Sequence, residues 1–271
     1  MRFVFFIIFI GITCLAWGAQ VDTVTIASKA MKRSYQCIVI KPANYPVGGK
    51  AFETVYLLHG HGGSFSNWYN RVPTLASYAS KYNLIIVCPE GKTAGWYLDS
   101  PMADSMQFET YIGTEVPAFI DAHYNTVKSR KGRAITGLSM GGHGGLTIGM
   151  KHLDNFGACG SMSGALLLSM ITDKRYGVDK LLGDTSHKDI YFQHSVMALL
   201  EKLPKDTLAI IIDCGTEDFI VEMSRLVHAK MLELHIPHDY IERPGKHEWK
   251  YWANAVEYQL LFFRKYFDSK H

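Results

Sequence analysis

The sequence has few of the features that mark unfolded or fibrous proteins. Its 271 residues include only 9 prolines, 48% of them are hydrophobic and 20% are charged. No internal repeat or low-complexity tract is present. This composition excludes a disordered chain, a collagen-like chain and a coiled coil. The length alone is compatible with one or two domains, and one domain is our expectation.

An excess of charge of one sign is also missing. The sequence has 28 lysines and arginines against 25 aspartates and glutamates, for a formal net charge of +3. No window concentrates this small excess into the basic stripe that a phosphate backbone would require. We therefore do not expect nucleic acid as a partner.

Cysteine is scarce as well. Only five cysteines occur, and Cys37, Cys88, Cys159 and Cys214 lie beyond the first 18 residues. Four cysteines in a chain of this length are too few for a disulfide framework. Cys88 and Cys214 end apolar runs, which favours buried free thiols, while the disulfide state of all four stays open at this point.

The first 18 residues differ from the rest. Arg2 precedes an unbroken apolar run over residues 3–10, and Ala16 and Gly18 place small residues at positions −3 and −1 of a cleavage site. The apolar stretch ends near Trp17 and is shorter than the ~20 residues that span a bilayer. An uncleaved anchor and a lipoprotein at Cys14 fit this pattern less well. The pattern predicts a signal peptide over residues 1–18, a secreted or periplasmic mature chain over residues 19–271, and no stable membrane span after cleavage.

Beyond residue 21, short apolar runs alternate with helical periods, which predicts an α/β fold: one domain with a mostly parallel sheet and helices on both faces. Residues 165–205 fit the alternation poorly and are interpreted as an excursion over the sheet, a small cap. In the helix expected around residues 108–120, Pro117 predicts a kink or a restart. The expected strands are 22–27, 35–40, 54–59, 84–88, 134–138, 208–214 and 240–242, and the other expected helices are 75–82, 224–235 and 249–267.

The pentapeptide Gly-Leu-Ser-Met-Gly at residues 137–141 matches the G-x-S-x-G pattern. It lies between an expected strand and a segment that can form a helix. A serine at such a turn adopts a strained backbone that only small neighbours permit, and its hydroxyl projects at the carboxyl edge of the sheet. Ser139 is therefore the predicted nucleophile.

A serine hydroxyl needs a base to accept its proton. The α/β-hydrolase arrangement supplies an acid and then a histidine after later strands, in that chain order. Glu217 and Asp218 follow the apolar run 208–214, and His247 follows the short run 240–242. Position alone indicates His247 as the base and leaves both acids as candidates.

Eight collinear stretches resemble the putative esterase family of α/β hydrolases, which includes feruloyl and tributyrin esterases, S-formylglutathione hydrolases and secreted mycolyltransferases. The resemblance covers about residues 55–252 and implies a triad of Ser139, Asp218 and His247. Lys246 replaces a glycine that is common in the family, and residues 166–169 match no ending that we recognise, so the substrate is not implied. The matching stretches are 57–63 (LLHGHGG), 89–91 (PEG), 95–100 (GWYLDS), 108–112 (FETYI), 137–142 (GLSMGG), 162–164 (MSG), 214–219 (CGTEDF) and 244–249 (PGKHEW).

Acyl transfer passes through an oxyanion that needs preorganised N–H donors. The N–H of Met140, directly after the nucleophile, is one expected donor, and the family resemblance implies His61 as the other. A metal site at His59 and His61 is the rival interpretation. Side chains two apart point to opposite sides of an extended chain, and no nearby Cys, Asp or Glu completes a zinc set, so we expect no metal and no cofactor.

Substrate contacts are expected in the loop that carries Trp96, Asp99 and Ser100, because it follows a strand at the catalytic edge. Trp249 is either a core residue or part of the pocket wall, since it lies close to His247 in the sequence. His143, on the helix after the nucleophile, is expected to pack rather than to catalyse.

The sequence thus predicts a secreted serine carboxylesterase that hydrolyses a small-molecule or oligosaccharide ester through an acyl-enzyme, with acetyl or feruloyl esters of carbohydrates as the expected substrates. Three alternatives stay open: an acyltransferase or a peptidase on the same triad, and a catalytically inactive extracellular binding protein. The sequence does not indicate the oligomeric state.

Overall fold

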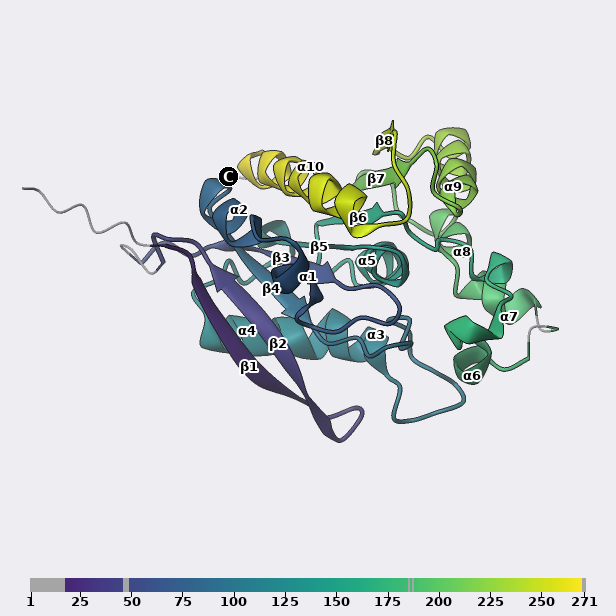
Figure 1. The fold of residues 1–271 in the computed structure, drawn as a ribbon, viewed down its shortest axis with the longest axis horizontal. Helices are drawn as coiled ribbons and strands as arrows, with labels where there is room; N and C mark the ends of the chain where they lie inside the picture. The colour runs from purple at the N-terminus through teal and green to yellow at the C-terminus, as the bar shows by residue number, and fades with distance from the viewer. Residues whose placement is uncertain (1–17, 46–48, 185, 187, 270–271) are drawn as a thin grey trace, which may run out of the picture.

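An eight-stranded sheet forms the centre of the molecule in the computed structural model, which describes residues 18–45, 49–184, 186 and 188–269. The strand order is β1-β2-β4-β3-β5-β6-β7-β8 (Figure 1). The strands are β1 (Gln20–Ser28), β2 (Arg33–Lys41), β3 (Glu53–Leu58), β4 (Leu84–Pro89), β5 (Arg133–Gly137), β6 (Ala158–Met162), β7 (Ala209–Gly215) and β8 (Asp239–Arg243).

The strand directions confirm the predicted mostly parallel sheet. β1 and β2 form an antiparallel hairpin, and β2 pairs antiparallel with β4. Every other neighbouring pair, from β4 across to β8, is parallel. The carboxyl ends of these parallel strands therefore meet at one edge of the sheet, where ligands bind in open α/β sheets.

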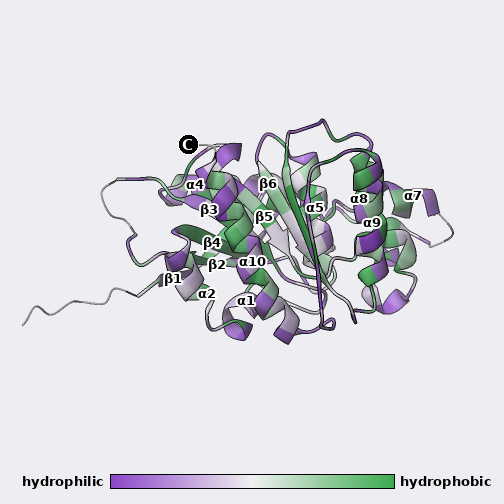
Figure 2. Cartoon of the chain, turned by 90° about the horizontal axis from the view of Figure 1, so that it is seen from above, coloured by the Kyte–Doolittle hydropathy of each residue, from purple (hydrophilic) through white to green (hydrophobic). Residues whose placement is uncertain are grey.

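Helices cover both faces of the sheet, as predicted. Alternate residues of β3 pack in different clusters: Val55 and Leu57 contact the core under α1, α2 and α10, while Tyr56 and Leu58 contact the core under α4, α5 and α9. Figure 2 shows apolar strands between helices with polar outer surfaces. The helices named here are α1 (Asn67–Arg71), α2 (Leu75–Lys81), α4 (Val116–His123), α5 (Met140–Lys151), α9 (Val221–Glu233) and α10 (Trp249–Asp268).

The helix around Pro117 runs through residues 108–123 without interruption and contains a π-helical turn, in place of the predicted kink or restart. A short turn, α3 (Phe108–Thr110), leads into a π-helical turn (Tyr111–Glu115), and α4 begins at Val116. Pro117 directly follows the π-helical turn, an irregularity in the helical hydrogen-bond pattern that accommodates a residue without a backbone N–H.

Strand β6 was not predicted, because its sequence Ala-Cys-Gly-Ser-Met lacks the apolar run of the other strands. Beyond it, residues 165–205 form α6 (Asp179–Leu182), α7 (Lys188–Gln193), α8 (Val196–Leu200) and two 3-10 turns (Leu168–Met170 and Lys174–Tyr176). They lie at one end of the molecule (Figure 1). These elements are short, so this segment is held mainly by its contacts with the rest of the chain.

Cys37, Cys88, Cys159 and Cys214 are all buried and free, as expected for Cys88 and Cys214. Of the predicted signal peptide, residues 1–17 lie outside the described residues. Within the part of the chain that the structure describes, no helix is both long and apolar enough to cross a membrane.

Candidate active site

Ser139 lies at a sharp turn between β5 and α5. Its backbone has φ 54° and ψ −115°, a strained combination for a residue with a side chain. Gly137 and Gly141 make the turn possible, because a Cβ on Gly137 would lie 2.6 Å from the carbonyl oxygen of Leu58 and a Cβ on Gly141 would lie 2.5 Å from the same atom. The strand, the turn and the helix therefore hold the Ser139 hydroxyl at the carboxyl edge of the sheet.

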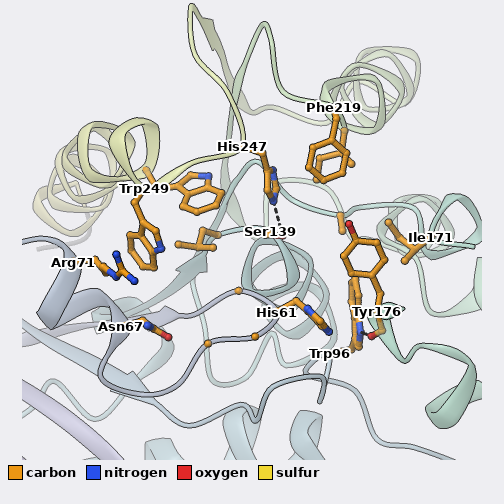
Figure 3. Close-up of a pocket in the computed structure, with 17 residues that line it drawn as sticks. His61, Asn67, Arg71, Trp96, Ser139, Ile171, Tyr176, Phe219, His247 and Trp249 are labelled. Atoms are coloured by element: carbon orange, nitrogen blue, oxygen red, sulfur yellow. Dashed lines mark hydrogen bonds between the residues drawn. The ribbon is translucent and has the colours of Figure 1, made fainter. Parts of the chain in front are cut away.

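His247 and Asp218 come from neighbouring strand ends and meet at Ser139. The Nε2 atom of His247 lies 2.9 Å from Ser139 Oγ, and the dashed line in Figure 3 marks this hydrogen bond. Its Nδ1 lies 3.0 and 2.9 Å from the two carboxylate oxygens of Asp218. In this arrangement Nδ1–H donates to Asp218 and Nε2 can accept the Ser139 proton. The three side chains form one continuous hydrogen-bonded chain.

Of the two candidate acids, the structure brings only Asp218 to the histidine. Asp218 is buried, whereas Glu217 is exposed, and the backbone N–H of Glu217 donates to the carbonyl of Gly245. The N–H of Ile220 donates to Asp218 Oδ1 at 3.1 Å. This bond helps to orient the carboxylate.

The buried carboxylate of Asp213 helps to hold the loop that carries His247. Tyr251 donates its hydroxyl proton to Asp213 Oδ1 at 2.5 Å, and Arg243 Nη2 lies 2.6 Å from Asp213 Oδ2. Burial raises the pKa of Asp213, and the donors on Tyr251 and Arg243 oppose that rise. Gly245 (φ 153°) packs so closely on Tyr251 that a Cβ would lie 2.3 Å from its ring. The loop before His247 is thus fixed to β7, β8 and α10.

The loop after β3 lies against the nucleophile turn. A Cβ on Gly60 would come within 3.4 Å of Ser139 Cβ. The N–H of Gly62 donates to Thr93 and the N–H of Gly63 donates to Gly60. No hydrogen bond to another described residue uses the N–H of His61, and the N–H of Met140 is the first in α5 and has no intrahelical acceptor. Both expected oxyanion donors are therefore available.

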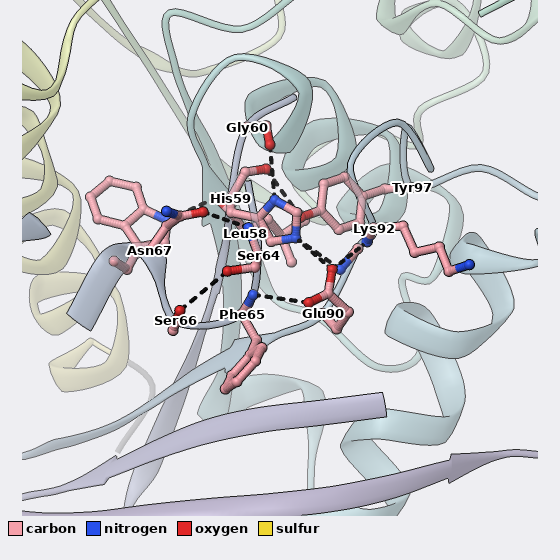
Figure 4. Close-up of polar contacts among 12 residues, drawn as sticks. Leu58, His59, Gly60, Ser64, Phe65, Ser66, Asn67, Glu90, Lys92 and Tyr97 are labelled. Atoms are coloured by element: carbon pink, nitrogen blue, oxygen red, sulfur yellow. Dashed lines mark hydrogen bonds and ion pairs between the residues drawn. The ribbon is translucent and has the colours of Figure 1, made fainter. Parts of the chain in front are cut away.

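His59 fixes this loop in place (Figure 4). The ring is buried; Nδ1 lies 2.9 Å from the carbonyl oxygen of Gly60, and Nε2 accepts the N–H of Gly91 at 2.9 Å. That pattern places the ring proton on Nδ1. Glu90, in the loop after β4, also joins this loop to the loop after β3. Its two carboxylate oxygens accept hydrogen bonds from the backbone N–H groups of Lys92 and Phe65. Burial would raise the pKa of Glu90, but these backbone donors lower it.

A cavity of about 340 Å³ opens at Ser139 and His247. Trp96 and Trp249 line it, as the sequence analysis allowed, and so does His61. Burial lowers the pKa of His61. Figure 3 labels several of the remaining side chains of the wall. These remaining side chains are those of Asn67, Arg71, Leu138, Ala165, Ile171, Tyr176, Phe219, Ile220 and Trp252.

Asp99 and Ser100 do not line this cavity, so the expected substrate contacts at these residues need correction. Asp99 accepts hydrogen bonds from the backbone N–H and the hydroxyl of Thr110, at 3.0 and 2.5 Å. The Ser100 hydroxyl is buried and donates to the carbonyl of Leu181 at 2.8 Å. Both side chains are used to hold the loop, and only Trp96 of this loop reaches the wall. The indole N–H of Trp96 is bonded to the carbonyl of Tyr176.

The sequence analysis missed several wall residues. Ile171 and Tyr176 belong to the excursion over residues 165–205, and nothing in a single sequence shows which part of such a segment returns to the site. Phe219 could have been suspected, because it directly follows Asp218; its ring lies 4.7 Å from that of His247. Asn67 and Arg71 follow the glycine-rich loop at a spacing of one helical turn, which was a usable signal.

His143 packs, as expected. It is buried against Trp96, and its Nε2 donates to the carbonyl of His194 at 2.8 Å. Burial lowers its pKa to about 4. Among the described residues, no group of three or more His, Cys, Asp or Glu side chains could hold a metal ion.

Comparison with known proteins relates this arrangement to ester hydrolases. The family model described as "Putative esterase" matches residues 28–263. An acetyl esterase of Caldicellulosiruptor saccharolyticus is 28% identical over 255 residues, which cover 85% of this chain and 94% of that protein. The structure of a ferulic acid esterase superposes with a TM-score of 0.80 at 25% identity, covering 93% of this chain and 99% of the other. An S-formylglutathione hydrolase from Agrobacterium tumefaciens has the same fold, with a TM-score of 0.79 at 22% identity and coverage of 93% and 97%.

Proposed function

Because the chain belongs to the putative esterase family of α/β hydrolases and is a serine hydrolase of carboxylic esters, we propose that Ser139, His247 and Asp218 are its catalytic triad. The observation that carries this proposal is the unbroken chain of contacts from Ser139 Oγ through His247 to the buried carboxylate of Asp218. Each side chain has the donor or acceptor atom that its role requires: a hydroxyl on Ser139, one protonated and one unprotonated ring nitrogen on His247, and a carboxylate on Asp218.

The reaction proceeds in two steps. Ser139 Oγ attacks the ester carbonyl carbon while His247 Nε2 takes the hydroxyl proton, and Asp218 stabilises the imidazolium that forms. The backbone N–H groups of His61 and Met140 bind the oxyanion. His247 then gives its proton to the departing alcohol, which leaves an acyl group on Ser139. Water, deprotonated by His247, attacks this acyl-enzyme and releases the acid and the free serine.

Acetyl or feruloyl esters of carbohydrates are the substrates that we propose. The names of the acetyl esterase and ferulic acid esterase relatives support this class, and the aromatic side chains of Trp249 and Tyr176 on the wall suit a sugar or phenolic ring. The cavity is about 340 Å³, which is at the small end of ligand pockets and favours a short acyl group over a long chain.

A substrate panel tests this proposal. We expect purified protein to release acetate or ferulate from acylated xylo-oligosaccharides with a higher kcat/KM than it shows on emulsified long-chain triglycerides. Equal or better turnover of the long-chain emulsion would contradict the substrate class. It would leave the proposed triad untouched.

The proposal includes secretion, with a signal peptide over residues 1–18. Expression of the full chain in a bacterial host, followed by N-terminal sequencing of the exported protein, is expected to give a chain that begins at Ala19. Retention of the first 18 residues on active protein in the cytoplasm would contradict this part of the proposal.

A further inference from the structure

Helix α1 places two polar side chains on the wall of the active-site cavity. Asn67 and Arg71 are four residues apart in α1 and therefore lie on the same face of this helix. Both line the cavity that contains Ser139 and His247. Figure 3 shows them on the side of the site where Trp249 lies.

Asn67 offers donors to this cavity and has its acceptor occupied. Its Oδ1 accepts the backbone N–H of Ser64 at 2.5 Å, which orients the amide. Its Nδ2 forms no hydrogen bond with another residue that the structure describes. The free polar group of Asn67 is thus an N–H donor.

Arg71 is a cation without a partner in the described part of the chain. This distinguishes it from most arginines of the molecule, whose guanidinium groups contact carboxylate or carbonyl oxygens. An unpaired guanidinium in the wall of a cavity is available to a ligand. The paired arginines are Arg130, Arg133, Arg175, Arg225, Arg243 and Arg264.

The formal charge in the lining of the cavity is positive only. No aspartate or glutamate is found among the described residues that line it, and Arg71 carries a permanent positive charge there. The carboxylate of Asp218 is directed to His247, away from this wall. A cleft with charge of one sign raises the local concentration of ligands of the opposite sign.

Trp249 supplies a fixed apolar surface beside these donors. Its indole is held by edge contacts with Trp68 at 5.3 Å and Trp252 at 5.5 Å between ring centroids. An aromatic ring that packs against two neighbours presents a face for a sugar ring at little entropic cost.

We propose that Asn67, Arg71 and Trp249 form a subsite for a carboxylate carried by the substrate, so that the preferred ester is an acylated acidic sugar, a uronic acid derivative. This inference rests on the proposed esterase function. A guanidinium binds a carboxylate through two parallel N–H···O bonds. The Asn67 amide adds a third donor, and Trp249 contacts the ring that bears the carboxylate.

Matched esters test the subsite. Acetylated glucuronic acid and acetylated glucose differ in a carboxylate on the alcohol side of the ester, and mono(4-nitrophenyl) succinate and 4-nitrophenyl butyrate differ in a carboxylate on the acyl side. For each pair, the ratio of kcat/KM for the anionic over the neutral ester is measured in wild type, Arg71→Gln and Arg71→Lys. We expect the ratio for the glucuronic acid and glucose pair to exceed 1 in wild type and to fall about tenfold in Arg71→Gln, with partial retention in Arg71→Lys.

Arg33→Gln is the matched control. Arg33 is exposed on β2, does not line the cavity, and its replacement removes the same charge. We expect this variant to keep the wild-type ratios. Added salt should lower the ratio in wild type more than in Arg71→Gln, because screening weakens the attraction.

Dependence on Arg71 that is confined to the succinate and butyrate pair would contradict the uronic acid derivative, because it would place the carboxylate on the acyl side of the ester. Ratios that are the same in wild type, Arg71→Gln and Arg33→Gln for both pairs would overturn the subsite. Failure of the wild-type protein to hydrolyse any of the four esters would instead contradict the esterase function itself, so the two failures are distinct.

Discussion

Two adjacent acids after β7 have opposite surroundings, although their side chains differ by one methylene group. Asp218 is buried against His247, and Glu217 points to solvent. We therefore expect Asp218→Asn to lower kcat on a short-chain aryl ester by about 1,000-fold or more, since an amide cannot hold the histidine tautomer or stabilise its charge. Glu217→Gln, the matched control, is expected to stay within about twofold of wild type. A larger loss of kcat in Glu217→Gln than in Asp218→Asn would assign the catalytic acid to Glu217 instead.

A second residue-scale prediction concerns pH and stability. Burial lowers the pKa of His143 to about 4, whereas a histidine in the unfolded chain has a pKa near 6.5. As the pH falls, the unfolded chain therefore binds this proton at a higher pH than the folded chain does. The stability that neutral His143 confers is complete above pH 6.5 and is lost progressively as the pH falls toward 4. His143→Gln keeps a donor for the carbonyl of His194 but removes the titration. We expect Tm, measured by circular dichroism, to fall less steeply from pH 7 to pH 4.5 in this variant. Parallel Tm curves would contradict the assignment.

At the scale of elements, the loops after β3 and β4 are held together by Glu90 and His59. Glu90→Gln weakens this connection, and we expect it to displace the His61 N–H and to lower kcat about tenfold, with a smaller change in KM, because a misplaced oxyanion donor acts mainly on the transition state. Glu109→Gln removes a carboxylate that pairs with Lys151 away from the cavity, and it should leave kcat close to wild type. Equal kcat values for the two variants would show that Glu90 does not position the loop.

Elements also show what a single sequence can predict. The runs that became β3, β4 and β7 are mainly apolar because both faces of these strands are buried, and the order of serine, acid and histidine along the chain indicated the candidate site. β6 escaped prediction, because residues as small as Gly160 and Ser161 form a strand only when β5 and β7 pair on either side. Part of the cavity wall was not predicted for a related reason: Ile171 and Tyr176 reach it from the segment 165–205, and only the folded structure shows which part of that segment returns to the site.

At the scale of the whole molecule, burial governs the four cysteines that the structure describes. Burial raises the pKa of the Cys214 thiol to about 12, and it also raises the pKa values of the Cys37, Cys88 and Cys159 thiols. We expect native protein to react with less than about one equivalent of a thiol reagent at pH 8, and guanidinium-unfolded protein to titrate four thiols without any reductant. A fifth reactive thiol would show that Cys14 is retained. Fewer than four would show a disulfide that the folded structure does not contain.

The claim on which the account depends is that Ser139 is the nucleophile. The most direct measurement is kcat for 4-nitrophenyl acetate in wild type and Ser139→Ala, combined with the intact mass of each protein after exposure to a fluorophosphonate. We expect the variant to lose about 1,000-fold or more in kcat with its circular dichroism spectrum unchanged, because the triad acts as a unit and loss of one hydroxyl at a surface turn disturbs little packing. Wild type should gain the mass of one adduct and Ser139→Ala none. Activity of the variant within tenfold of wild type, or an adduct on the variant, would contradict the account.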